Sequence, residues 1–180
     1  MREEYAIILD FLPNGYPGSR HSIPIAQVIG TSYFSLLELI AKDGIQLHQE
    51  ERVYIGEGKR DKIRSIRRRL TLSQLTNVAH TVLEEILDNL IRENEQRFVE
   101  FFNKAGTVTP RLHQLELLPG IGKKSVEKIL EHRPFLSFEE VKNKAELPDP
   151  VKVIRERILR ELEGKEKYYI FVAPPARRRF

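Results

Sequence analysis

The residues best suited to bind an anion lie in one short segment, Leu117-Leu118-Pro119-Gly120-Ile121-Gly122-Lys123-Lys124-Ser125. Its two glycines allow the backbone to turn sharply and remove the side chains that would hold a ligand away from the main chain. The apolar spacing that follows predicts a helix, whose first N–H groups and positive dipole end would face outward. Two lysines are unfavourable in a first helical turn, but a neighbouring phosphate would explain them. The segment therefore predicts a phosphate site formed by Gly120, Ile121, Gly122, Lys123, Lys124 and Ser125.

In this predicted site the N–H groups of residues 120–122 bind the phosphate and the two lysines add charge. The order apolar-Pro-Gly-apolar-Gly-basic, between two helical segments, resembles the helix-hairpin-helix motif. The resemblance implies binding to the sugar-phosphate backbone of DNA or RNA that is independent of the base sequence.

Other glycine-rich loops fit the segment less well. A dinucleotide-binding loop requires a preceding strand and a third glycine, and Ser125 stands at that third position. A Walker loop requires a glycine where Leu117 stands. A tight turn between two helices that binds no ligand is a further alternative, but it does not account for the lysines.

A second copy of the pattern follows 29 residues later, with Pro148 at the position equivalent to Pro119. A helical unit that recurs at a fixed offset indicates a tandem repeat. In the second copy Asp149-Pro150-Val151 replaces the two glycines and their spacer. Asp149 is a good N-cap and Pro150 a good first helical residue. We therefore expect a double helix-hairpin-helix domain over residues 107–163, with one phosphate-binding hairpin and one structural hairpin.

Capping signals predict the helices of this domain. Thr109-Pro110 is typical of a helix start, and Ser137-x-x-Glu140 is a capping box. Pro134 and Gly164 are typical of residues that follow helix ends. Together these signals predict four short helices between about residues 110 and 163.

Composition limits the class of protein. The chain has 180 residues, of which 41% are hydrophobic, enough for one large or two small packed domains. The absence of cysteine excludes disulfides and thiolate metal sites, and the five histidines show no metal-ligand spacing, so we expect no metal and no cofactor. No apolar run is long enough to span a membrane, and the first residues do not resemble a signal peptide. The sequence predicts a soluble cytoplasmic protein.

Positive charge is concentrated in two clusters, although the net charge is only +4. The first cluster holds seven basic residues: Lys59, Arg60, Lys62, Arg64, Arg67, Arg68 and Arg69. The second is Arg177-Arg178-Arg179. Such clusters are typical of polyanion binding, although a solvated basic strip is the simpler alternative. Together with the predicted phosphate site, the first cluster is interpreted as a continuation of the nucleic-acid contact.

The N-terminal part predicts β-structure. Strand patterns separated by turn residues occur at Tyr5–Leu9, Ala26–Gly30, Tyr33–Ile40 and Arg52–Gly56, and another occurs at Lys167–Val172. Short strands in this number predict a small OB-like barrel over residues 1–70, completed by a C-terminal strand within residues 164–180. The run from Tyr33 to Leu39 is also apolar enough to be a helix.

A helical pattern over residues 71–106 connects the two parts as one long helix or a helix pair. Thr71-x-x-Gln74 resembles a capping box, and Lys104-Ala105-Gly106 is typical of a helix end. The predicted fold class is therefore α+β: an OB-like barrel and an all-helical double helix-hairpin-helix domain, joined by a long helical segment.

Over nearly its whole length the chain is similar to an uncharacterised archaeal protein family that couples an OB-like barrel to a helix-hairpin-helix region. The similarity rests on three segments: the Leu118–Lys124 hairpin, the Val53–Gly56 run with the basic residues after it, and the Gln27–Thr31 run. The resemblance implies nucleic-acid binding by analogy of fold and implies no particular substrate.

Two other function classes match part of this sequence. DNA glycosylases and abasic-site lyases also carry Leu-Pro-Gly-apolar-Gly, and in the lyases the catalytic lysine lies two residues after the second glycine, where Lys124 stands. Those enzymes also need an aspartate beyond the second helix, and residues 131–144 contain none. A protein-interaction module is the other alternative, but protein contact does not require bare backbone beside lysines.

The sequence thus predicts a non-catalytic protein that binds DNA or RNA largely without sequence preference, with no catalytic residue and no membrane contact. Unpaired bases would stack on aromatic side chains of the barrel, although barrel aromatics more often belong to the core. The candidates are Tyr33, Phe34 and Tyr54.

Overall fold

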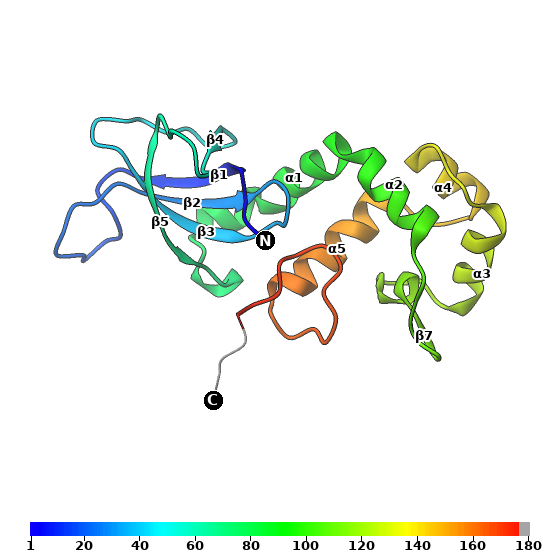
Figure 1. Cartoon of the computed structure of the whole chain (residues 1–180). Coiled ribbons are helices and arrows are strands. Elements are labelled where there is room, and N and C mark those ends of the chain that lie inside the picture. Colours follow the sequence, from blue (N-terminus) through cyan, green and yellow to red (C-terminus); the bar gives the residue numbers. More distant parts are fainter. Residues whose placement is uncertain (177–180) are drawn as a thin grey trace. The chain divides into compact units, whose positions relative to one another are not determined.

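The computed structural model describes residues 1–176 and has an α+β fold, as the sequence predicts (Figure 1). It divides into two compact units. The first contains residues Met1–Ile86 and the segment from Arg160 onward, and the second contains Leu87–Leu159. The chain therefore leaves the first unit, forms the second and then returns to the first.

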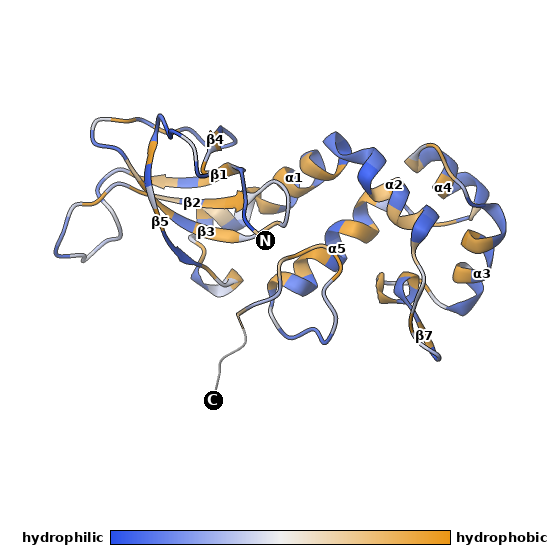
Figure 2. Cartoon of the chain, viewed as in Figure 1, coloured by the Kyte–Doolittle hydropathy of each residue, from blue (hydrophilic) through white to orange (hydrophobic). Residues whose placement is uncertain are grey.

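The first unit is built on a curled, five-stranded antiparallel sheet, a half-barrel with strand order β4-β1-β2-β3-β5 (Figure 1). The strands are β1 (Tyr5–Leu12), β2 (Ile25–Gly30), β3 (Leu36–Ala41), β4 (Arg52–Tyr54) and β5 (Ile63–Arg69). Alternate side chains point to one face and form a buried cluster that includes Ile8, Val28, Leu39, Val53 and Ile63. The central strand β2 is buried along its whole length, and Figure 2 shows it as mainly hydrophobic.

The strands predicted at Tyr5–Leu9, Ala26–Gly30 and Arg52–Gly56 correspond to β1, β2 and β4. The run from Tyr33 is a strand and not a helix, but β3 begins only at Leu36. Phe34 has a positive φ of 54°, which takes the backbone out of the extended region and delays the strand.

Strand β5 was missed by the sequence reasoning, which treated its residues only as a basic cluster. Ile63 and Ile66 are the only apolar side chains in β5, and two register shifts against β3 interrupt the alternation. A bulge adds one residue to a strand without a partner opposite it, so the period-2 pattern is lost.

The predicted C-terminal strand at Lys167–Val172 is wrong, because that segment forms no strand. The Glu161 carboxylate accepts hydrogen bonds from the N–H groups of Ile170, Phe171 and Val172 at 2.7, 3.0 and 3.1 Å. These N–H groups are therefore not available to a sheet neighbour. The segment does return to the first unit, since the Ala173 N–H donates to the Tyr33 carbonyl at 3.1 Å. The predicted basic tail Arg177–Arg179 lies outside the described residues.

The connecting region is a helix pair, α1 (Asn77–Glu93) and α2 (Glu95–Lys104), separated at Asn94. The capping box at Thr71 is present, but it opens the single 3-10 turn η1 (Leu72–Gln74) and not the long helix. Helix α1 starts after Thr76, whose hydroxyl accepts the Ala79 N–H at 3.1 Å. Because α1 begins in the first unit and ends in the second, the connecting region is shared between them.

The second unit continues with a short hairpin of β6 (Thr107–Thr109) and β7 (Leu112–His113), then the 3-10 turn η2 (Gln114–Leu117). The helices α3 (Lys123–His132), α4 (Phe138–Lys144) and α5 (Pro150–Leu162) follow, and α5 crosses into the first unit at Arg160. No helix among the residues that the structure describes is long and apolar enough to cross a membrane.

The predicted helix start at Thr109-Pro110 is wrong, because Thr109 ends β6 and Pro110 lies in the turn to β7. The cap lies further on: His113 Nδ1 accepts the Leu115 N–H at 3.1 Å, and Glu116 accepts the His113 N–H at 2.7 Å. This arrangement opens a 3-10 turn of only four residues. Residues 110–163 therefore hold one 3-10 turn and three α-helices, in place of the four helices expected.

Candidate nucleic-acid interface

The turn before α3 is held by one buried side chain. Gly120 has a positive φ of 78°, a conformation that glycine adopts without strain. The Ile121 N–H donates to the Leu118 carbonyl at 3.1 Å, and the Ile121 side chain is only 5% exposed. Ile121 is therefore an anchor of the turn, and its N–H, predicted to bind phosphate, is already used inside the turn.

Helix α3 begins without a side-chain cap. Its N-cap is Gly122, and its first turn contains no acidic residue. The N–H groups of Lys123, Lys124 and Ser125 have no partner within the helix, because the first N–H groups of any α-helix lack one. A β-carbon placed on Gly120 or Gly122 would meet nothing within 4 Å. The space beside both glycines at the start of α3 is therefore open.

The other two helix starts of this region are capped by their own side chains. Ser137 Oγ accepts the Glu140 N–H at 3.1 Å at the start of α4, and two glutamates lie in that first turn. Asp149 Oδ1 accepts the Val151 N–H at 3.0 Å at the start of α5. The caps predicted at Ser137 and Asp149 are thus confirmed. Among residues 110–163, only α3 lacks a side-chain cap at its N-terminus.

The two lysines of α3 are both exposed, but they are not equivalent. Lys123 is 78% exposed and lies 3.7 Å from the Glu116 carboxylate, which already accepts the His113 N–H. Within residues 1–176, Lys124 makes no ion pair. Lys124 therefore carries the less compensated charge at this turn.

A buried arginine that the sequence reasoning overlooked supports the turn. Arg157 is 2% exposed, and its Nη1 donates to the Leu117 carbonyl at 3.1 Å. A charged group is buried only when it is hydrogen-bonded. This hydrogen bond therefore holds α5 against η2, which leads into the turn before α3. The signal was present in the sequence, because Arg157 falls three residues after Ile154, on the apolar face of its helix.

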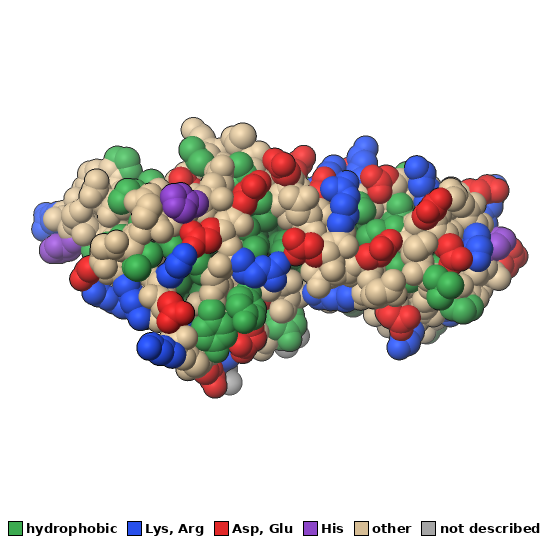
Figure 3. Space-filling view, turned by 90° about the horizontal axis from the view of Figure 1, so that it is seen from above, with side chains coloured by type: hydrophobic (Ala, Val, Ile, Leu, Met, Phe, Trp, Pro, Cys, Tyr) green, Lys and Arg blue, Asp and Glu red, His purple; other side chains and the backbone are tan. Residues whose placement is uncertain are grey.

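The residues of the predicted basic cluster lie in β5 and the loop before it, and most have acceptors inside the protein. Arg60 Nε donates to the Gly56 carbonyl at 2.8 Å, and Lys62 pairs with Glu51. Arg64 pairs with the exposed Asp43 at 3.0 Å. Lys59 is exposed in the loop. On the face seen in Figure 3, basic side chains are mixed with acidic ones.

The last three arginines of β5 bind three partner residues. Arg67 and Arg68 both reach the carboxylate of Glu38, at 3.5 and 3.1 Å. Arg69 donates to the carbonyls of Pro174, at 3.0 Å, and of Ala173. Residues 59–69 belong to the first unit and residues 120–125 to the second.

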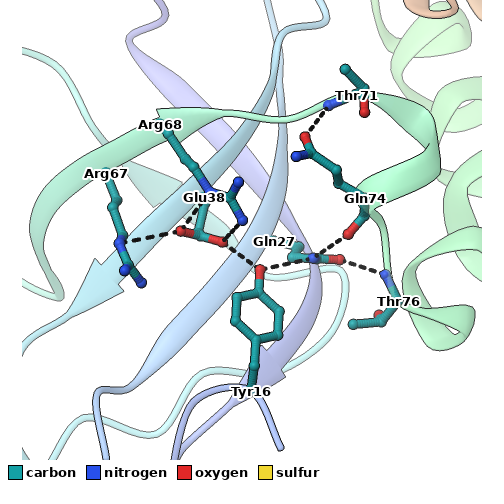
Figure 4. A network of polar contacts seen from close by, with 8 residues as sticks. All are labelled: Tyr16, Gln27, Glu38, Arg67, Arg68, Thr71, Gln74 and Thr76. Carbon is teal, nitrogen blue, oxygen red and sulfur yellow. Dashed lines mark hydrogen bonds and ion pairs between the residues drawn. The ribbon is translucent and has the colours of Figure 1, made fainter. Parts of the chain in front are cut away.

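Glu38 lies at the centre of a polar network (Figure 4). Its side chain is fully buried and accepts hydrogen bonds from Tyr16 and Arg68. Burial alone would raise its pKa, but the Arg68 and Tyr16 hydrogen bonds and the charges of Arg68 and Arg67 outweigh this, so the pKa of Glu38 lies below its ordinary value. Burial and the neighbouring Glu38 raise the pKa of Tyr16.

Comparison with known proteins decides the family. A family model described as a protein of unknown function, DUF655, matches residues 2–173. The chain belongs to the DUF655 family.

Two DUF655 relatives are archaeal. The uncharacterized protein MJ0038 of Methanocaldococcus jannaschii is 45% identical over 174 residues, which cover 94% of this chain and 80% of the relative. The crystal structure of Af1531 from Archaeoglobus fulgidus is 41% identical, with a TM-score of 0.87, and the match covers 95% of this chain and all of Af1531. Membership of an uncharacterised archaeal family, predicted from the sequence, is confirmed.

The exposure of the aromatic side chains in this DUF655 protein agrees only in part with the prediction that they stack on bases. Phe34 is completely buried, so its predicted contact with bases is wrong. Tyr33 and Tyr54 are half-buried. Tyr54 packs edge-on against Tyr5, with ring centroids 5.4 Å apart. Tyr5 is 43% exposed and is the aromatic side chain of the half-barrel that sequence reasoning missed.

Proposed function

We propose that this protein binds DNA or RNA through the phosphate backbone, without reading sequence, and that residues 119–125 form the working hairpin of a double helix-hairpin-helix. Asp149 caps the second hairpin, which has a structural role. The protein performs no chemistry on the nucleic acid.

The uncapped start of α3 carries this proposal. Its free N–H groups attract an anion, as helix N-termini do. The bare backbone of Gly120 and Gly122 lets a phosphate approach closely, since no side chain fills the space beside either residue. Exposed Lys123 and Lys124 would otherwise oppose the helix dipole. A phosphate at this point removes that conflict and replaces the missing cap.

The first unit supports the same proposal by analogy. We further propose that its curled five-stranded half-barrel is an OB-like fold, because OB folds bind nucleic-acid strands along such sheets. The basic residues of β5 and its preceding loop supply further positive charge, although internal carboxylates compensate part of it.

The proposal is tested by reversing the charge of the hairpin. The double variant Lys123→Glu/Lys124→Glu should bind short DNA or RNA at least about tenfold more weakly, and its salt slope should fall by about two, because two phosphate contacts are lost. Fluorescence anisotropy with single-stranded DNA, the matching RNA and the DNA duplex, each between about 50 and 200 mM salt, measures both quantities.

The matched control is Lys142→Glu/Lys144→Glu, which changes the net charge equally, on exposed lysines in the last turn of α4. We expect this control to keep most of the affinity. Equal losses in the two double variants would assign binding to net charge and reject the hairpin. If the unmodified protein binds none of the three nucleic acids at low salt, the proposed function is wrong.

A further inference from the structure

Two arginines converge on one buried carboxylate in the first unit. Glu38 is 0% exposed, whereas Arg67 and Arg68 are 48% and 47% exposed. Arg68 donates through Nε to Oε2 and through Nη2 to Oε1 of Glu38, both at 3.1 Å. Arg67 Nε lies 3.5 Å from Oε2. One negative charge thus faces two positive charges, and the group keeps a net charge of about +1.

A bulge in β5 makes this convergence possible. Arg68 is opposite Glu38 and Ile66 is opposite Leu39, so Arg67 is the extra residue between the two pairs. Neighbouring residues of a regular strand point to opposite faces. A bulge re-aims one of them, and here both arginine side chains reach the same carboxylate.

A chain of hydrogen bonds through Tyr16 and Gln27 holds the Glu38 carboxylate in place (Figure 4). The Tyr16 hydroxyl donates to Glu38 and accepts from Gln27 Nε2 at 3.0 Å. Gln27 Nε2 also donates to the Gln74 carbonyl at 3.0 Å, and Gln27 Oε1 accepts the Thr76 N–H at 2.8 Å. Every polar atom of the Gln27 amide is therefore used, and the chain of bonds locks the position of Glu38.

This arrangement exceeds what the carboxylate itself requires. One bidentate arginine already satisfies a buried carboxylate, so the second arginine has another role. Arg68 contacts Glu38 with the edge formed by Nε and Nη2. A guanidinium has a second edge, formed by its two Nη groups, with the same spacing for the oxygens of a phosphate.

We propose that Arg67 and Arg68 form a clamp for one phosphate group of a nucleic-acid backbone, and that Glu38 is the residue that positions them. The inference rests on the proposed function and deepens it, because it adds a second, rigid contact point in the first unit. A pair of guanidinium groups held in place before binding loses less side-chain entropy than free lysines do.

Two substitutions separate the clamp from simple electrostatics. Glu38→Gln raises the net charge by one, so a purely electrostatic surface would bind nucleic acid more tightly. The clamp predicts about tenfold weaker binding, because the arginines lose the charged acceptor that orients them. Arg68→Lys keeps the charge, so electrostatics predicts no change. The clamp predicts a similar loss, because lysine has no second edge.

Matched controls lie on exposed side chains of the first unit. Glu163→Gln changes the net charge as Glu38→Gln does, and Arg160→Lys is the same replacement as Arg68→Lys. Both controls should bind as the unmodified protein does. Thermal melts identify a variant that has lost its fold. If Glu38→Gln does not fold, the comparison of Arg68→Lys with Arg160→Lys decides the matter.

A second measurement keeps this inference separate from the proposed function. Inorganic phosphate is titrated into the protein while the arginine Nε–H signals are followed by NMR. The Arg68 signal should shift at lower phosphate concentration than the Arg160 signal. If this occurs while no oligonucleotide binds, the nucleic-acid function is wrong, and the site binds free phosphate. If oligonucleotides bind but Glu38→Gln and Arg68→Lys leave affinity unchanged or tighter, the clamp is wrong and the function stands. If the Arg68 signal shifts no earlier than that of Arg160, the clamp is also wrong.

Discussion

Placing an aspartate at the start of α3 should stabilise the protein and weaken its binding to nucleic acid. Gly122 is the N-cap, with φ −99° and ψ −174°, the extended conformation that capping residues adopt. A β-carbon there meets nothing within 4 Å, so Gly122→Asp introduces no clash. Its carboxylate would accept a first-turn N–H, as Asp149 does at the start of α5.

The gain in stability follows from two contributions. Replacing an N-cap glycine by aspartate contributes a few tenths of a kcal/mol, and a negative charge at the helix N-terminus contributes about 0.3–1 kcal/mol. The total is about 1 kcal/mol. If the second unit, residues 87–159, unfolds by itself, Tm should rise by about 4–8 °C; if the whole chain unfolds together, the rise should be about 2–4 °C.

Binding should change in the opposite direction, because the new carboxylate occupies the place proposed for the phosphate and repels it. Gly122→Ser is the matched variant that adds a neutral cap, and we expect it to lose less affinity than Gly122→Asp. Calorimetry and anisotropy on the three proteins measure both quantities. Unchanged affinity in Gly122→Asp, together with a raised Tm, would refute the assignment of this helix start to phosphate binding.

Three further predictions concern the second hairpin, enzymatic activity and the buried Glu38. Asp149→Ala should cost about 1 kcal/mol of stability, like the matched cap removal Ser137→Ala, and leave binding to nucleic acid unchanged or slightly tighter. Calorimetry measures the stability and anisotropy the binding. A loss of binding in Asp149→Ala alone would mean that the second hairpin, and not the first, binds phosphate. Borohydride should trap no covalent adduct between the protein and abasic DNA, whereas an adduct that disappears in Lys124→Ala would support the lyase alternative. The pKa of Glu38 is lowered in the folded protein, so its contribution to stability is present above the ordinary glutamate value of 4.5 and is lost as the pH falls through the folded-state pKa. On acidification, Tm should therefore fall less steeply in Glu38→Gln than in the unmodified protein. Parallel curves of Tm against pH for the two proteins would contradict this.

The features that were predicted from the sequence depend on neighbouring residues. The start of α3 after Gly122, the cap at Ser137 and the cap at Asp149 each follow from a few adjacent side chains, because backbone conformation and capping are local properties. Strands β1, β2 and β4 were predicted for the same reason, because each is a short apolar run bounded by turn residues. The binding role of the hairpin stays a prediction, since it concerns a partner outside the chain.

The features that were missed depend on residues far apart in the sequence. Glu38, Arg157 and Glu161 are charged residues with less than 3% exposure, and each is satisfied by a partner or backbone group that only the fold supplies. A charged residue is normally exposed, so the sequence alone gave no reason to place Glu38 or Glu161 in the interior. The wrong C-terminal strand follows from this, since Glu161 takes the N–H groups of residues 170–172. Strand β5 was missed because its register shifts against β3 remove the period-2 pattern.

The return of the C-terminal segment to the first unit has a consequence for how the chain acquires its structure. The second unit is an insertion within the first, so all of its residues leave the ribosome before Glu161 does. The first unit lacks the hydrogen bonds of Glu161 and the Ala173 contact to Tyr33 until residues 161–173 have been synthesised. The inserted unit can therefore complete its fold first during synthesis, reversing the usual order in which N-terminal domains fold earlier. For the same reason, the first unit should be produced in isolation by joining residue 86 to residue 160 through a linker, and not by cutting the chain after residue 86.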